Sequence, residues 1–120
     1  MRETYHKVKN LFIYQTDEEM YQVREDWRSH AESVKKGKIF RDDCDGFSLT
    51  CAELLYEQKR FEDIRLVHCL TETNGSHLVC YCDGFVLDNR QRTIMDWELV
   101  PYTWIKSMSL NEIGVWRSMS

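Results

Sequence analysis

The spacing of apolar residues changes near Arg60, and this change restricts the folds that the chain can adopt. From Cys44 to Leu55, apolar or small residues recur three or four positions apart, as on a helix that packs on a core. After Arg60 they alternate with polar residues, as in strands with one buried face. The sequence therefore predicts an α+β fold, with helices first and an antiparallel sheet of about four strands after them.

Turn residues separate the predicted strands. Asp83-Gly84 lies between two apolar runs and is typical of a two-residue hairpin loop. Asn74-Gly75 marks another turn. The strands are expected at 64–70, 77–82, 85–89 and 102–108, with residues 115–116 adding an edge.

Capping and turn residues predict the secondary structure of the first half of the chain. Residues 11–15 are expected to be extended, and Asp17 is a suitable N-cap for a helix over 18–29. A short helix over 31–36 would end at Gly37. The helix that carries Cys44 is expected to start after Asp42 as its N-cap.

Composition excludes several classes of function. The 120 residues suffice for a single domain, and 42% of them are hydrophobic, so a real core is expected. A net charge of −4 without a basic run predicts no nucleic-acid partner. With no membrane-length apolar stretch and no signal peptide, we expect no membrane association and a cytoplasmic location.

The cysteines are expected to be free thiols. There are five, an odd number, at positions 44, 51, 69, 80 and 82. His68 beside the strand cysteines raises the alternative of a zinc site, but Cys80 and Cys82 lack the usual knuckle spacing. We therefore interpret the cysteines other than Cys44 as packing residues.

Three residues point to chemistry by their order along the chain: Cys44 at the start of a helix, His77 at the head of a strand and Asp88 at the end of the next strand. A two-residue loop at Asp83-Gly84 pairs Cys82 with Phe85. This register places His77 and Asp88 on one face as diagonal neighbours, about 7–8 Å apart or less between Cβ atoms.

Each of these residue types has a role in thiol catalysis. A thiolate attacks, an imidazole moves the proton, and a carboxylate orients the imidazole. The start of a helix favours the thiolate. Asp42, Asp43 and Asp45 oppose it, so they must point away, be paired, or bind a cation.

The segment Asp43-Cys44-Asp45-Gly46-Phe47-Ser48 is similar to the Asp-Cys-Glu-Asp-Tyr-Ala signature of the bacterial transglutaminase-like cysteine proteinases. The resemblance covers about residues 10 to 117. It continues through His77-Leu78-Val79, Phe85-Val86-Leu87-Asp88-Asn89, Trp97, the run from Pro101 to Lys106 and Trp116, and it includes N-terminal residues such as Tyr14 and Trp27.

The resemblance implies a papain-like fold in its transglutaminase-like form and a triad of Cys44, His77 and Asp88. The family includes a calcium-requiring periplasmic protease of a surface adhesin, and acidic residues beside its cysteine take part in calcium binding. The matching positions are Asp43 and Asp45, although Gly46 stands where the family has Asp. The triad itself requires no cofactor.

The leading hypothesis is a thiol hydrolase that cleaves or transfers an amide bond in a protein or peptide, with Trp27, Arg90 and Tyr102 lining the substrate cleft. Protease, deamidase and transamidase remain alternatives. The short chain without a signal peptide fits a phage or prophage member, located in the host cytoplasm if it is phage-encoded. The second hypothesis is a catalytically silent binding module that captures a host protein in the same cleft.

Overall fold

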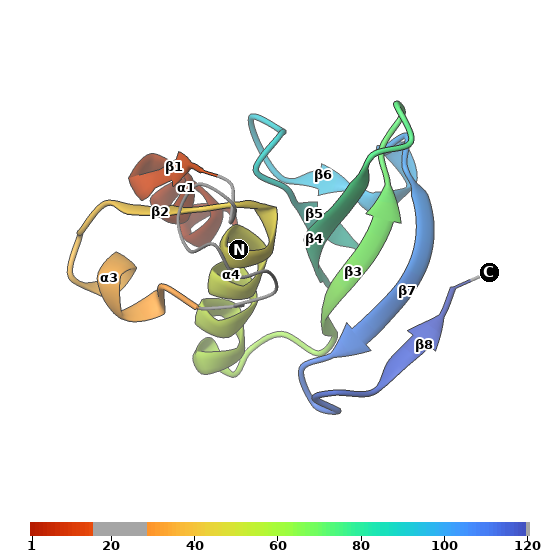
Figure 1. The fold of residues 1–120 in the computed structure, drawn as a ribbon. Helices are drawn as coiled ribbons and strands as arrows, with labels where there is room; N and C mark the ends of the chain where they lie inside the picture. Colours follow the sequence, from red (N-terminus) through yellow and green to blue (C-terminus); the bar gives the residue numbers. More distant parts are fainter. Residues whose placement is uncertain (16–28, 120) are drawn as a thin grey trace.

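The computed structural model describes residues 1–15 and 29–119. Within these ranges the helices lie on one side of the molecule and a twisted six-stranded sheet lies on the other (Figure 1). The helices are α1 (Arg2–Leu11), α3 (Ala31–Lys35) and α4 (Cys44–Gln58). This arrangement confirms the predicted α+β class.

The sheet has the strand order β6-β5-β4-β3-β7-β8, and all of its pairs are antiparallel. Two short strands lie at the edges beyond the expected four, and one of them begins at Trp116, where an edge strand was expected. The bounds are β3 (Ile64–Leu70), β4 (Ser76–Cys82), β5 (Phe85–Leu87), β6 (Met95–Asp96), β7 (Thr103–Ser109) and β8 (Trp116–Ser118), with a 3-10 turn, η1 (Trp97–Leu99), after β6.

The hairpin between β4 and β5 has the predicted register. Cys82 pairs with Phe85, and both Asp83 and Gly84 have positive φ, as a type I′ turn requires. Pairing ends at Cys80 with Leu87, so β5 is two residues shorter than expected. Asp88 therefore lies in the loop that follows β5.

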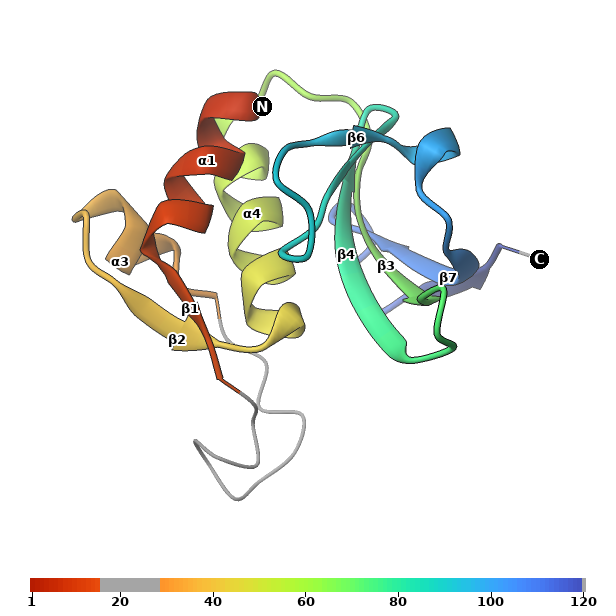
Figure 2. The same cartoon turned by 90° about the horizontal axis from the view of Figure 1, so that it is seen from above.

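Helix α1 was not expected from the sequence. Its side chains Tyr5 and Val8 are fully buried, while most of its remaining surface is polar. It leads into β1 (Phe12–Tyr14), which pairs in parallel with β2 (Phe40–Asp42) beside α4 (Figure 2). The extended arm predicted for 11–15 thus exists, but it starts one residue later.

Helix α4 is the helix predicted from the apolar stripe, and it packs against β4 and β3. Its N-cap is Asp43, not Asp42 as expected, because Asp43 Oδ1 accepts hydrogen bonds from the backbone N–H groups of Asp45 and Gly46. Asp42 instead ends β2 and is buried.

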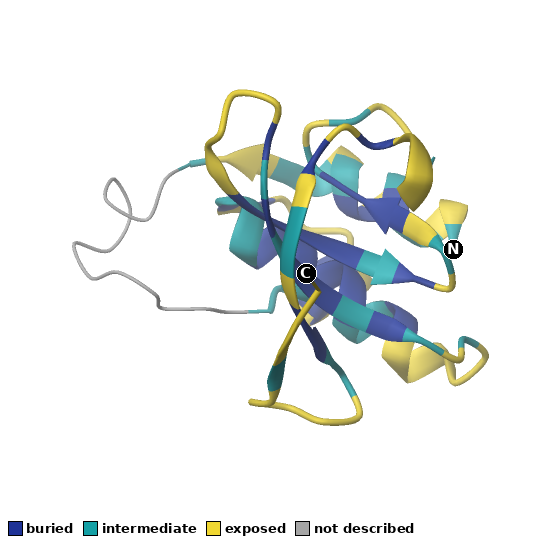
Figure 3. Cartoon of the chain, turned by 90° about the vertical axis from the view of Figure 1, so that its right-hand side faces the viewer, coloured by how far each residue is buried: buried dark blue, intermediate teal, exposed yellow. Residues whose placement is uncertain are grey.

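Buried residues form a cluster on each face of the sheet. One cluster joins the three helices to the face that contains Leu66, Leu78 and Cys80. The other lies on the opposite face, around Val67, Val79 and Tyr102. Figure 3 shows that the burial concentrates in the central strands and helices and that the connecting loops are exposed.

Three predictions fall on residues that the structure does not describe: the helix over 18–29 except for its last residue, its N-cap Asp17 and the cleft residue Trp27. The short helix before Gly37 is confirmed, with Gly37 at a φ of 71°. No helix within residues 1–15 and 29–119 is long and apolar enough to cross a membrane.

Candidate active site

Cys44 is the first residue of α4, and its side chain is partly exposed, whereas the other four cysteines are buried. The helix is tied to the sheet at this end, because the buried Ser48 hydroxyl donates to the carbonyl of Leu78 at 2.9 Å. Leu78 follows His77 in β4. The packing of α4 on β4 therefore brings the cysteine to the strand that carries the histidine.

His77 and Asp88 form a buried hydrogen-bonded pair. The Nε2 atom of His77 lies 2.7 Å from Oδ1 of Asp88, and the two side chains are 6% and 0% exposed. A carboxylate can only accept, so Nε2 carries a hydrogen, and the neutral form of the ring has its lone pair on Nδ1. The neighbourhood predicted from the hairpin register is confirmed.

Asp88 is held at both of its carboxylate oxygens. The Tyr102 hydroxyl donates to Oδ2 at 2.6 Å, and the backbone N–H of Arg90 donates to Oδ1 at 3.0 Å. Burial alone would raise the pKa of Asp88. The hydrogen bond and charge of His77, together with the hydrogen bonds from Tyr102 and the Arg90 backbone, instead hold this pKa below its usual value. Asp88 is therefore an ionised carboxylate at neutral pH.

Helix α1 holds the loop that carries Asp88. The buried Tyr5 hydroxyl lies 2.9 Å from the carbonyl oxygen of Asp88 and 2.5 Å from that of Gln91. The ammonium of Lys9 also donates to the carbonyl of Gln91 and, at 2.9 Å, to that of Asn89. These contacts connect the N-terminal helix to the site across about 80 residues of sequence.

Cys44 and His77 face a common groove with a volume of about 870 Å³. Asp43, Cys44 and Asp45 lie on its helix side, and His68, His77 and Lys106 lie on its sheet side. The groove therefore has acidic groups at one wall and a cation at the other.

The thiol of Cys44 is not poised as a thiolate in this structure. Its Sγ donates to Oδ1 of Asp45 at 3.6 Å. Burial, followed by the negative charge of Asp45, raises the pKa of Cys44 well above that of a free thiol. Burial and the charge of Asp43 in turn raise the pKa of Asp45 to about 6.

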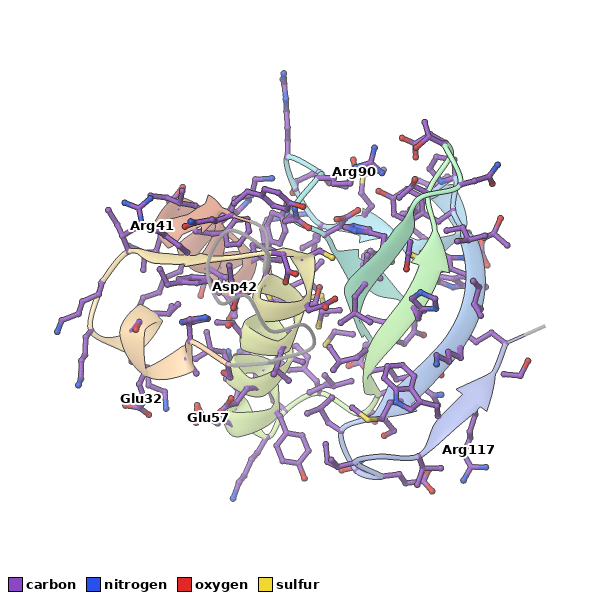
Figure 4. All side chains as sticks on the ribbon, viewed as in Figure 1. Glu32, Arg41, Asp42, Glu57, Arg90 and Arg117 are labelled. Carbon is purple, nitrogen blue, oxygen red and sulfur yellow. The ribbon has the colours of Figure 1, made fainter. Side chains whose placement is uncertain are left out.

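Asp42 supports the first turn of α4 from beneath. Its Oδ2 lies 2.8 Å from Nε2 of His30, and its Oδ1 accepts from the N–H of Asp43 at 2.8 Å. A Cβ atom on Gly46 would lie 2.0 Å from Oδ2 of Asp42, so only glycine fits above this carboxylate. Figure 4 shows Asp42 beside α4 and Arg90 in the loop between β5 and β6.

The predicted cleft residues Arg90 and Tyr102 are not among those that line the groove. Tyr102 binds Asp88, and Arg90 donates to the Tyr102 hydroxyl at 3.0 Å and pairs with Glu72 at 2.7 Å. A role of either residue in the cleft stays a prediction. The sequence did not predict that Tyr5 belongs to this site. The spacing of Tyr5, Val8 and Leu11 could have indicated the helix that carries it.

The acidic residues beside Cys44 already have partners within the protein. Asp43 is occupied as the helix cap, Asp42 is paired with His30, and Asp45 accepts from Cys44. Within the described ranges, no group of three or more His, Cys, Asp or Glu side chains is arranged to hold a metal ion. Calcium at Asp43 and Asp45 stays a prediction, and no step proposed below depends on it.

Residues 1–120 match the family model described as bacterial transglutaminase-like cysteine proteinase, BTLCP. The chain belongs to this family. A comparison with curated protein sequences found no match. Membership in a family of cysteine proteinases agrees with a cysteine at the start of a helix beside a His–Asp pair.

Among solved structures, Legionella pneumophila LapG is similar to this chain, with a TM-score of 0.61 and 20% sequence identity. The match covers 88% of this chain and 64% of LapG, so this family member spans less than two thirds of LapG. At that identity the likeness shows the fold. It confirms the transglutaminase-like arrangement of N-terminal helices, with the Cys44 helix packed on an antiparallel sheet.

Proposed function

We propose that this family member is a thiol hydrolase that cleaves or transfers an amide bond of a protein or peptide, with Cys44 as nucleophile, His77 as acid and base, and Asp88 as the orienting carboxylate. The observation that carries the proposal is the buried His77–Asp88 hydrogen bond of 2.7 Å beside the groove that Cys44 enters. It leaves Nδ1 as the ring nitrogen available to the thiol.

The reaction would proceed in two steps. Nδ1 of His77 takes the thiol proton, and the Cys44 sulfur attacks the carbonyl carbon. The amine leaves with the proton from His77, and an acyl-thioester remains on Cys44. Water would then complete hydrolysis, whereas a second amine would complete transamidation.

The start of α4 offers a donor for the oxyanion of the tetrahedral intermediate. The Asp43 cap uses the N–H groups of Asp45 and Gly46, and within residues 1–15 and 29–119 the N–H of Cys44 has no acceptor. Free N–H groups at a helix start stabilise developing negative charge. We propose this N–H as one donor.

The thiol–Asp45 hydrogen bond favours a second candidate, a binding module without turnover. In that case Cys44 stays protonated, and the groove captures a protein. We favour the hydrolase, because catalytic hydrogen bonds are often looser without substrate and because a silent site would not need a doubly held Asp88. The cytoplasmic location and the phage or prophage origin stay predictions.

The two candidates differ in the reactivity of Cys44. For the hydrolase, iodoacetamide at mildly acidic pH should label Cys44 selectively in the native protein, and Cys44→Ala should abolish both labelling and activity. His77→Ala should slow labelling, while His6→Ala, at a partly exposed position on α1 outside the groove, serves as the matched control. Selective labelling elsewhere, with Cys44 inert, would contradict the proposal.

A further inference from the structure

We infer that the sheet wall of the groove is a subsite for a carboxylate of the substrate, centred on Lys106; this inference rests on the proposed function. The side chain of Lys106 is exposed and lines the groove together with Cys44 and His77. Its ammonium lies 5.1 Å from the ring centroid of Trp116, which is a cation–π contact.

The charge of Lys106 is available to a ligand. In the described part of the chain, no carboxylate lies within ion-pair distance of its ammonium, although four other lysine and arginine side chains have such partners. The aromatic ring of Trp116 holds the cation without neutralising it. An anion that enters the groove would therefore meet an uncompensated positive charge.

His68 and Ser76 add hydrogen-bonding groups beside Lys106. His68 is the cross-strand partner of Lys106, and its Nε2 lies 2.8 Å from the Ser76 hydroxyl oxygen. Burial and the neighbouring Lys106 lower the pKa of His68, so the imidazole is neutral near pH 7. One cation with polar neutral neighbours is a suitable environment for a carboxylate.

The acidic residues on the helix side of the groove restrict where a carboxylate of the substrate could lie. Asp43 and Asp45 flank Cys44, so an acidic side chain next to the scissile bond would be repelled. An acidic side chain farther along the groove would be attracted by Lys106. The opposed charges would thus orient an extended substrate as well as select it.

Strand register gives the approximate position of the acidic residue. Leu78, next to His77, pairs with His68, and His68 pairs with Lys106. Two strand spacings amount to about 10 Å, which corresponds to roughly two or three residues of extended peptide. We therefore expect Asp or Glu about two or three positions from the scissile bond, or a chain-terminal carboxylate at that distance.

Binding can be measured without turnover in the Cys44→Ala protein. Fluorescence anisotropy would compare labelled, otherwise uncharged peptides that contain one Glu or one Gln, each with a free or an amidated C-terminus. We expect the Glu peptides to bind about fivefold more tightly. A preference that depends only on the free C-terminus would identify the chain terminus as the source of the carboxylate.

Variants assign the preference to Lys106. In the Cys44→Ala background, Lys106→Met should remove it, Lys106→Arg should retain it, and Lys106→Glu should reverse it in favour of a Lys peptide. Arg117→Met is the matched control, because it makes the same charge change on the neighbouring strand β8 (Figure 4). There Arg117 pairs with Glu112. Equal binding of all four peptides, or a preference that persists in Lys106→Met, overturns the inference.

Digestion of a proteome-derived peptide library by the wild type tests the position. Enrichment of Asp or Glu two or three residues from the cleaved bond, lost in Lys106→Met through KM, supports the subsite. Cleavage with no acidic preference refutes the subsite and leaves the hydrolase intact. Charge-dependent binding with an inert Cys44 refutes the hydrolase and leaves the subsite intact.

Discussion

Cys44 and Asp45 are sequence neighbours whose side chains oppose each other chemically. The thiol donates to the carboxylate, and the carboxylate charge helps to keep the thiol protonated. The pKa of Asp45 is about 6, so this opposition is strongest above that pH. Asp45 therefore restrains the nucleophile in the structure without substrate.

We predict that Asp45→Asn speeds the alkylation of Cys44. Removing the charge should lower the pKa of the thiol, and a decrease of one unit corresponds to about a tenfold rise in thiolate. The rate with iodoacetamide should rise above pH 7 and approach that of the wild type below pH 6, where Asp45 is itself protonated. Asp96→Asn makes the same charge change at an exposed position and should have no effect; equal rates at all pH values would contradict the prediction.

The same substitution has a predicted effect on stability. Folded Asp45 keeps its proton up to about pH 6, whereas an unfolded Asp releases it near pH ~4. The stability that this proton contributes is thus present below pH ~4 and lost as the pH rises through about 6. Urea unfolding should show that Asp45→Asn gains about 1–2 kcal/mol over the wild type at pH 8 and nothing at pH 4.

Among the elements, α4 depends on β2 at its first turn. Asp42, the last residue of β2, occupies the space where a side chain at position 46 would begin. His30, immediately before α3, holds Asp42 in place and stacks on Phe40. The position of Cys44 therefore depends on a strand and a helix outside the sheet.

We predict that Gly46→Ala destabilises the protein by about 3 kcal/mol, because the new methyl group overlaps the Asp42 carboxylate. In the Asp42→Gly background the same substitution should cost less than about 1 kcal/mol, and urea unfolding of the four proteins measures this coupling. Gly75→Ala is the control, since a Cβ there meets Thr71 Oγ1 at an ordinary 3.4 Å. Equal costs in both backgrounds would show that the steric account is wrong.

Helix α1 acts on the site through the loop after β5. Tyr5→Phe removes the hydroxyl that the carbonyls of Asp88 and Gln91 share, so we predict a loss of about 1–3 kcal/mol in unfolding free energy. Turnover should also fall, because the backbone carbonyl of Asp88 would lose its hydrogen bond from Tyr5. Tyr56→Phe, at an exposed position on α4, should change stability by less than about 0.5 kcal/mol. A Tyr5→Phe protein as stable as this control would show that the Tyr5 hydroxyl does not hold the loop after β5.

For the molecule as a whole, the two faces of the sheet bury four of the five thiols. Cys51, Cys80 and Cys82 lie in the cluster under the helices, and Cys69 lies in the cluster on the other face. Burial raises the pKa of each. The strand cysteines are thus divided between the faces and serve as apolar packing residues.

We predict that the native protein reacts with one equivalent of a thiol reagent such as Ellman's reagent and that the unfolded protein reacts with five, the number of cysteines. The four slow thiols should become reactive together, with the rate of global unfolding, because both clusters share the central strands. Measurement of reaction against urea concentration checks this. A buried thiol that reacts well before unfolding would indicate that one cluster opens separately.

Local signals were sufficient for much of the fold and for part of the site. Asp83-Gly84 predicted the register that joins His77 to Asp88, because turn chemistry acts over only a few residues. The stripe from Cys44 to Leu55 predicted α4. Helix α1 was missed, because its short apolar side lies in a highly charged segment, and Asp42 was misplaced as the cap of α4.

Neighbouring residues were enough to place the helix, the hairpin and the order of Cys44, His77 and Asp88, since helical period and turn preference are properties of short segments. Packing between distant segments decided the rest: the Tyr5 contact with a residue 83 positions away, the fit of Gly46 over Asp42, and the burial that keeps the Cys44 thiol protonated beside Asp45. Burial and its effect on pKa depend on which surfaces meet in three dimensions, and no local pattern records that.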